Sequence, residues 1–387
     1  MLTAPGLDVY CIVMKLEFNS SPASTVGVEM ELQLVDRKTR AHTSAASEMI
    51  ESVGEVDWLK KELLQSTIEI NTDVCADITE VEADLGAKLE QVRGCAARLG
   101  LGLLSAGTHP FSPWGEQVVS DDERYHRLVD KVQWPARRML IFGLQVHVGV
   151  PDAESAIQIT NHLEPWLPHL LALSASSPFW EGKDTGLASC RSKIFETLPT
   201  AGLPYRHESW EDFEQLVGAL VRSEGIESIR EIWWDVRPHP GFGTVEVRVC
   251  DALPTLGETV AIAALVQALI VHLQVRIAAG STLPILHPRI VTENKWRAAR
   301  YSMEGTTIVD EDGACEPIGE TMEKLLEELA PVFERLGSSG QVPVLSEMVR
   351  GRLSYARQRA VFEQAGSTEA VVDALIREGE ENRPAAG

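Results

Sequence analysis

The sequence is short of basic residues, of clustered cysteines and of long apolar runs. Its 35 Lys and Arg stand against 57 Asp and Glu. The resulting net charge of −22 argues against nucleic acid as a partner, because phosphates need a basic surface. The six cysteines lie far apart, with no pair at metal-knuckle or redox spacing, so we expect reduced thiols in a cytoplasmic protein. No apolar run reaches the roughly 20 residues that a membrane helix needs, so no membrane partner is expected.

Two further groups of signatures are absent. Neither Gly-x-x-x-x-Gly-Lys-Ser/Thr nor Gly-x-Gly-x-x-Gly occurs, which excludes the usual phosphate-binding loops of nucleotide folds. The sequence also shows no recognisable Ser–His–Asp or Cys–His pattern of a covalent catalyst. ATP is still compatible with the acidic composition, because an acidic site can bind divalent cations that bridge to phosphates.

Five segments alternate apolar and polar residues, which is the period of a β-strand with one face against a core. They span residues 26–34, 67–71, 142–148, 232–237 and 244–249. If the five share a sheet, its outward face collects carboxylates, arginines, an amide and an imidazole: Glu29, Glu31, Glu69, Gln145, His147, Arg237, Glu246 and Arg248. A solvated outer face is the simpler interpretation of any single Glu-x-Glu. Recurrence across strands favours a site, because converging carboxylates repel one another unless a hard cation such as Mg²⁺ lies between them.

Helical segments separate these strands. We expect them at 80–99, 121–139, 153–174, 210–223 and 256–279. Capping boxes predict the start of three helices, at Thr79 with Glu82, Ser120 with Glu123, and Thr255 with Glu258. Pro135 should kink or end the second helix. Because each strand keeps one polar face, the fold class is α+β, with a mainly antiparallel or mixed sheet and helices on one face.

The chain reads as a single catalytic domain over residues 14–380. Beyond Pro288 the pattern is helical without a clear strand, and this helical region covers about 290–380. Its expected helices are 292–304, 318–338, 342–364 and 368–379. We expect residues 1–13 to be a disordered or overextended start, and residues 381–387 to be a disordered tail.

Several candidate site residues also have a purely structural interpretation. His147 could be a metal ligand, a general base or a hydrogen-bonded core histidine. Arg237 and Arg248 could grip a carboxylate or a phosphate through two hydrogen bonds, or pair with the neighbouring glutamates. Arg191 and Lys193 lie in a polar loop after a long helix, and that loop could close over phosphates.

Six stretches in family order resemble the YbdK-type carboxylate–amine ligases, also called glutamate–cysteine ligase type 2. They are GVEMELQ at 27–33, THP at 108–110, ERY at 123–125, GLQVHVG at 143–149, WDVRP at 234–238 and GTVEVRVCD at 243–251. The resemblance implies a glutamine-synthetase-like catalytic fold, whose mainly antiparallel curved sheet forms a floor under ATP and two or more Mg²⁺ ions. It also implies amino acids as the other small-molecule substrates. A homo-oligomer is compatible with this fold.

The resemblance further implies an activity and roles for individual residues. The activity is ATP-dependent amide formation through an acyl phosphate, nominally between the γ-carboxylate of glutamate and the amine of cysteine. The implied metal ligands are Glu29, Glu31, Glu69 and Glu246; the catalytic residues are Arg237, Arg248, Arg191 and His147; and the cofactor-binding residues are Gln145, Trp233, Lys193 and Thr244. We expect Glu246→Ala to abolish turnover and leave the fold intact. The alternatives are another acid or amine, a metal-dependent phosphotransferase of related fold, or a non-catalytic nucleotide or amino-acid sensor.

Overall fold

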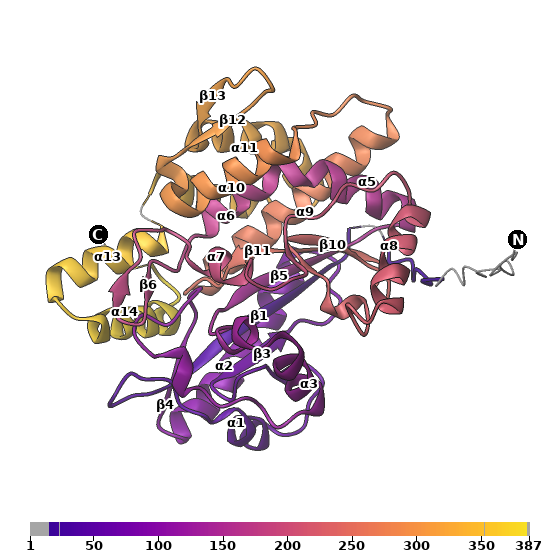
Figure 1. Cartoon of the computed structure of the whole chain (residues 1–387). Helices are drawn as coiled ribbons and strands as arrows, with labels where there is room; N and C mark the ends of the chain where they lie inside the picture. The colour runs from indigo at the N-terminus through magenta and orange to yellow at the C-terminus, as the bar shows by residue number, and fades with distance from the viewer. Residues whose placement is uncertain (1–14, 23, 352, 385–387) are drawn as a thin grey trace, which may run out of the picture.

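Seven strands form the central sheet of the computed structural model, which describes residues 15–22, 24–351 and 353–384 (Figure 1). Their order is β10-β11-β5-β1-β3-β2, with β4 also paired to β1, and every pairing in this sheet is antiparallel. The strands are β1 Val26–Asp36, β2 Leu59–Lys61, β3 Thr67–Asn71, β4 Leu101–Leu104, β5 Gly143–Gly149, β10 Val236–His239 and β11 Thr244–Asp251. The expected α+β class with an antiparallel sheet is confirmed. The expected N-terminal segment 1–13 lies outside the described residues.

The strand register brings the predicted polar residues onto one face. Glu31 lies opposite Glu69 of β3, and Glu29 lies opposite Gln145 of β5. His147 lies opposite Glu246 of β11. Because side chains alternate along a strand, residues paired across these ladders share a face. The sequence-based expectation that the alternating segments pool their polar sides is therefore correct.

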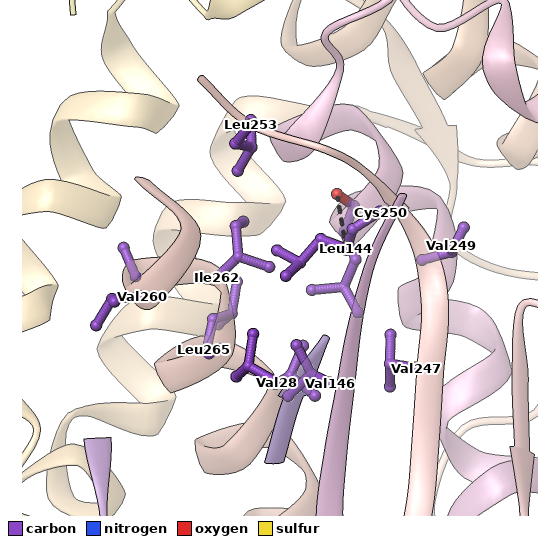
Figure 2. Close-up of a cluster of buried hydrophobic side chains, with 14 of the residues drawn as sticks. Val28, Leu144, Val146, Val247, Val249, Cys250, Leu253, Val260, Ile262 and Leu265 are labelled. Carbon is purple, nitrogen blue, oxygen red and sulfur yellow. Dashed lines mark hydrogen bonds between the residues drawn. The ribbon is translucent and has the colours of Figure 1, made fainter. Parts of the chain in front are cut away.

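The other face of the sheet is apolar and packs under helices. The covering helices are α2 Ile78–Arg98, α5 Ala153–Leu163, α6 Leu167–Ser174 and α9 Leu256–Ala278. Figure 2 shows Val28 and Val146 beside Ile262 and Leu265 of α9, and all four are buried. Each such side chain contributes about 1.5–3 kcal/mol when it is fully buried. This packing fixes which face of the sheet remains available for chemistry.

Helix α9 is long and apolar enough to cross a membrane by length and composition alone. An 18-residue window of it has a mean hydropathy of 1.9. Within the fold, however, 72% of that window is buried, between the sheet and the C-terminal helices. Gln267 and other polar residues interrupt the apolar run. A core helix has the same composition, so this helix is weak evidence for a membrane span.

Most of the remaining helices agree with the expected pattern, but two were not expected, at 46–53 and at 191–195, where we had predicted the polar loop of Arg191 and Lys193. The remaining helices are α1 Ala46–Val53, α3 Glu123–Val132, α4 Trp134–Arg137, α7 Arg191–Phe195, α8 Trp210–Arg222, α10 Pro288–Tyr301, α11 Ile318–Arg335, α12 Val342–Arg350, α13 Ser354–Ala365 and α14 Thr368–Glu381. The expected helices 121–139, 153–174 and 342–364 each divide into two. The first divides at Gln133, whose φ of 61° interrupts the helix two residues before Pro135.

Short strands lie outside the central sheet. They are β6 Phe179–Trp180, β7 Lys183–Asp184, β8 Ala201–Gly202, β9 Trp233–Trp234, β12 Thr306–Ile308 and β13 Cys315–Pro317. The β12–β13 hairpin lies in the C-terminal region, where we expected no clear strand. The expected continuous strand 232–237 is also wrong. The chain breaks at Asp235, because β9 pairs with β8 while β10 joins the central sheet.

Helix ends show where local capping signals succeed and fail. Thr255 caps α9 as expected, accepting from the Glu258 N–H at 3.1 Å and hydrogen-bonding its carboxylate at 2.8 Å. The other two expected boxes are wrong. Asp77 caps α2 and Asp122 caps α3, because each aspartate accepts a backbone N–H of the first turn. At the C-terminus, Asn382 caps α14 where we expected a disordered tail, and residues 385–387 lie outside the described residues.

Candidate active site

Glu29, His147 and Glu246 form a compact set of potential metal ligands on the polar face of the sheet. One candidate ligand atom from each lies within 4.8 Å of the other two. His147 Nε2 is 3.5 Å from Glu29 Oε1 and 3.9 Å from Glu246 Oε1. The other ring nitrogen, Nδ1, hydrogen-bonds Thr244 Oγ1 at 3.0 Å, which fixes the orientation of the ring. Among the described residues, the buried Nε2 has no hydrogen-bond partner.

A second group of carboxylates, Glu31, Glu62 and Glu69, lies beside the first. Burial, followed by the charge of Glu31, raises the pKa of Glu62 to about 7. Burial, followed by the charges of Glu29 and its acidic neighbours, holds the pKa of Glu69 well above its ordinary value. Burial also raises the pKa of Glu31, although Arg191 opposes the shift. These three carboxylates and Glu29 therefore repel one another in the absence of a cation.

Glu62 is the member of this group that sequence reasoning missed. It follows β2 directly, between Lys60–Lys61 and Leu63–Leu64, where no alternating pattern marks an outward position. Ser120 Oγ donates to the Glu62 carbonyl at 2.5 Å and Leu64 packs against Leu140 and Phe142, and Glu62 lines one cavity with Glu31. No signal in the single sequence distinguishes it from an ordinary surface glutamate.

Glu246 is held between two arginines. Arg237 Nε donates to Glu246 Oε2 at 2.7 Å, and Arg248 pairs with Oε1. Although burial alone would raise the pKa of Glu246, these two arginines and His147 hold it well below its ordinary value. Of the two interpretations of these arginines, the structure shows the pairing with glutamate, and the grip on a ligand stays a prediction. Arg248 also keeps a buried Nε that has no hydrogen-bond partner among the described residues, so it retains a donor for a ligand.

Arg191 reaches the site from behind. Its two terminal nitrogens donate to the carbonyls of Val249 and Arg248, each at 3.2 Å, and one lies 3.7 Å from Asp251. A β-bulge between Val247 and Cys250 leaves these two carbonyls outside the regular β5 ladder. These contacts fix Arg191 against β11. Its guanidinium thereby holds the backbone at Arg248 and places a positive charge near Glu31.

Gly143 leaves the room that this arrangement requires. A Cβ on Gly143 would lie 2.3 Å from a terminal nitrogen of Arg191, which no side chain could tolerate without displacing the guanidinium. The Gly143 N–H donates to Glu31 Oε2 at 2.6 Å, and Gln145 Nε2 donates to Glu31 Oε1 at 3.0 Å. The Glu31 carboxylate is thereby held with a defined orientation on the polar face.

The four residues expected to bind a cofactor do not all lie at the site. Thr244 orients His147, and Gln145 holds Glu31 while its buried Oε1 has no partner among the described residues. Trp233 lies beside Arg248 and Glu31 in one cavity. Lys193 instead pairs with Glu196 at 2.8 Å and lies over the ring of Trp296. It is absent from the described residues that line the two cavities beside the carboxylates.

Two cavities flank the carboxylates. The first, of about 420 Å³, is lined by Glu29, His147 and Thr244 together with Trp58, Lys60, Asn71, Asp73, Val74 and Phe242. The second, of about 130 Å³, is lined by Glu31, Glu62 and Arg248 together with Arg124, Tyr125 and Trp233. Glu29 lines the first cavity and Glu31 the second, and these two residues lie two apart on β1, about 7 Å from each other. Two different ligands could therefore approach the same group of carboxylates.

Comparison with known proteins places this geometry in a family. The family model described as Glutamate-cysteine ligase family 2 (GCS2) matches residues 25–374. A Frankia casuarinae protein provisionally named glutamate–cysteine ligase 2-1 is 47% identical over 96% of this chain and 99% of its own length. A Thermobifida fusca protein provisionally named glutamate–cysteine ligase 2 is 45% identical over 97% of this chain and 95% of its own.

Solved structures share the fold at much lower identity. Glutamate–cysteine ligase from Francisella tularensis, solved in complex with AMP, is 14% identical and superimposes with a TM-score of 0.69 over 95% of this chain and 90% of its own. A bifunctional glutathione synthetase from Pasteurella multocida is 16% identical, with a TM-score of 0.65 over 93% of this chain and 52% of its own. At such identities the likeness shows the fold alone. The match over nearly the whole sequence shows that the chain belongs to glutamate–cysteine ligase family 2.

Proposed function

We propose that this protein is an ATP-dependent carboxylate–amine ligase that forms an amide bond through an acyl phosphate. The nominal reaction joins the γ-carboxylate of glutamate to the amine of cysteine and releases ADP and phosphate. One observation carries the proposal: two cavities of different character are lined by neighbouring carboxylates of one group, which includes the Glu29–His147–Glu246 set. Such a site suits transfer of a phosphoryl group from a nucleotide on one side to an acid on the other.

The donor set fits Mg²⁺. Glu29, His147 and Glu246 would hold one ion, and Glu31, Glu62 and Glu69 would hold a second. Two observations support the fit: the unpartnered His147 Nε2, and the raised pKa of Glu69 among its acidic neighbours. When bound, the ions would offset the negative charge on the phosphoryl oxygens during transfer.

The first cavity is the better nucleotide site. It is the larger of the two, and Trp58, Val74 and Phe242 give it apolar walls suited to a purine base. Glu29 and His147 lie at its inner end, so a triphosphate would extend toward the carboxylates. The AMP complex of the Francisella ligase is consistent with a nucleotide in this fold.

The second cavity would hold the acid substrate. Arg248 has a free buried Nε there, and Arg124 adds a further cation at the cavity wall. These arginines would align the substrate carboxylate with the phosphoryl donor, while Tyr125 and Trp233 limit the access of water. No nucleophile from the protein is needed, because the carboxylate itself attacks the γ-phosphorus. The amine then displaces phosphate from the acyl carbon.

The test is to incubate the protein with Mg²⁺, ATP, glutamate and a panel of amines that includes cysteine. We expect release of ADP and phosphate that depends on the amine, together with a new amide mass. A stable phosphorylated acid formed without any amine would instead indicate a phosphotransferase. ATP bound without turnover would indicate a sensor, and either result would overturn the proposal.

A further inference from the structure

We infer that the amine substrate is larger than cysteine and carries a carboxylate remote from its amine, which binds in a basic vestibule beyond Trp233. This inference rests on the proposed function and extends it to the class of amine. The vestibule consists of Arg124, Arg127, Lys131, Arg230, Glu227 and Glu231, with Trp233 as its inner wall.

Trp233 is the residue that joins the site to this outer space. It is half-buried and lines the second cavity beside Glu31 and Arg248. It also lines the vestibule, which has about 150 Å³ and lies between α3 and the turn Ile229–Glu231. A further space of about 420 Å³ follows, between Lys131 and the segment 197–200, with Trp233 again in its wall. A molecule in the second cavity can thus extend outward past the indole.

The vestibule is basic in a strongly acidic protein. Four cations line it against two carboxylates, whereas the whole chain has 22 more acidic than basic residues. Arg127 lies 3.3 Å from Glu227, and Lys131 lies 3.2 Å from Glu231. For Arg124 and Arg230, no carboxylate lies within 4.0 Å among the residues that the structure describes. These two exposed guanidiniums are therefore available to a carboxylate ligand.

Arg124 links the vestibule to the second cavity, where the acid substrate would bind. It lines both the second cavity and the vestibule, packs over the ring of Tyr125 at 4.9 Å, and its charge opposes the burial that raises the pKa of Glu62. The second cavity has about 130 Å³, which is room for one small acid. An amine that attacks this acid must therefore come from the side of Trp233. In cysteine the amine and the carboxylate share one carbon, so cysteine would leave the outer cations unused.

The experiment compares amines that differ in a remote carboxylate. With glutamate, ATP and Mg²⁺, kcat/KM is measured for 6-aminohexanoate, glycylglycine, n-hexylamine and cysteine. We expect kcat/KM for the two amines with a remote carboxylate, 6-aminohexanoate and glycylglycine, to be about tenfold higher than for n-hexylamine or cysteine. A factor of about ten is the value of one good charge-assisted contact. Equal use of 6-aminohexanoate and n-hexylamine, or a preference for cysteine, would overturn the inference while leaving the ligase function intact. Absence of any amide with every amine would overturn the proposed function and the inference together.

Variants of Arg230 test whether the preference for a remote carboxylate arises in the vestibule. Arg230→Ala should bring the ratio of kcat/KM for 6-aminohexanoate to that for n-hexylamine close to one, and Arg230→Glu should invert it. Arg230 is exposed, so these variants should fold normally. Arg289→Ala is the matched control, because Arg289 is an exposed arginine at the start of α10, outside the described lining of these cavities. A ratio that Arg230→Glu leaves unchanged would refute the vestibule as the carboxylate site.

Discussion

Arg237 and Glu246 lie directly opposite each other across the β10–β11 ladder, and the arginine Nε donates to the carboxylate at 2.7 Å. Both side chains are buried, and Arg237 also donates to the backbone carbonyls of Ile229 and Ile232. Glu246 thus neutralises Arg237 and Arg248, and in the proposed function it also completes the ligand set with His147. Its removal should affect stability as well as activity.

The first prediction concerns Glu246→Ala. We expect loss of turnover, as the sequence suggests, but also a loss of about 3–5 kcal/mol in the free energy of unfolding, because two buried arginines lose their partner. Urea unfolding measures the stability, and ADP release measures the turnover. Glu246→Gln keeps one acceptor oxygen for one of the two arginines and should cost less. An alanine variant within about 1 kcal/mol of the parent would show that the arginines find other partners.

Divalent cations should bind to the carboxylates and stabilise the fold. We expect Mg²⁺ to raise the melting temperature, since binding to the native state alone adds RT ln(1 + [L]/Kd). Glu29→Gln and His147→Asn should each weaken the affinity, measured by titration calorimetry, by about tenfold or more. Glu363→Gln on α13, an exposed glutamate, is the control that should leave the affinity unchanged. Equal affinities for all three variants would place the ion elsewhere.

Phe242 should contribute to nucleotide binding. Its ring is 56% exposed at the first cavity and stacks on His239 with centroids 4.2 Å apart. We expect Phe242→Ala to raise the KM for ATP by about 3–10-fold, because an aromatic pair is worth roughly 0.5–1.5 kcal/mol beyond its area. The KM for the acid should change little. Tyr205→Ala, which removes another exposed ring outside the lining of this cavity, should leave both KM values unchanged.

Lys295 should be essential for stability. Its Nζ lies 2.5 Å from Asp235 Oδ2 and 2.7 Å from Glu196 Oε1, with 2% of the side chain exposed. The Asp235 carbonyl accepts from the Arg248 N–H at 2.8 Å, so this group holds the strand break beside the site. Lys295→Met should cost about 3–5 kcal/mol in urea unfolding, because two carboxylates lose their counter-ion. Lys193→Met removes the more exposed partner of Glu196 and should cost less than about 1 kcal/mol.

Glu164 should make stability depend on pH away from the site. Burial raises its pKa to about 7, against an ordinary 4.5, although Arg206 opposes the shift. Below the ordinary pKa both folded and unfolded states are protonated. As pH rises toward 7 only the unfolded state loses the proton, so the parent loses stability across this window. The free energy of unfolding of Glu164→Gln, measured with urea, should therefore be about 1–3 kcal/mol larger than that of the parent at pH 8 and equal to it at pH 4. A constant difference across this range would contradict the assignment.

The sequence predicted the features that follow from the alternation of side chains along a strand. Alternation along β1 placed Glu29 and Glu31 on the same side, and the register with β5 and β11 confirmed the shared face. Alternation cannot show where a strand changes partners, so the break at Asp235 was missed. It also cannot identify Glu62, because this residue reaches the site from a loop after a strand of three residues.

The sequence also could not predict ion pairs between residues far apart in the chain. Nothing near Lys295 in the sequence indicates Asp235, which is 60 residues earlier, yet burial makes each the necessary partner of the other. Lys193 shows a different limit. The sequence predicted it in a polar loop, whereas it lies on α7 and pairs with Glu196 one helical turn away; its role toward phosphate stays a prediction.

The bulge in β11 restricts how this strand can change in length. Before it, Val247 lies opposite Val146; after it, Cys250 lies opposite Leu144, so two residues face one and the alternation changes phase. That change of phase is why Glu246 and Asp251, an even and an odd position, point to the same side. Deleting one residue of the bulge would restore regular alternation and leave Asp251 opposite Gly143, but it would take from Arg191 one of the two carbonyls, of Arg248 and Val249, that hold it outside the ladder. Insertions and deletions should therefore be tolerated in the surrounding loops far better than in these few positions.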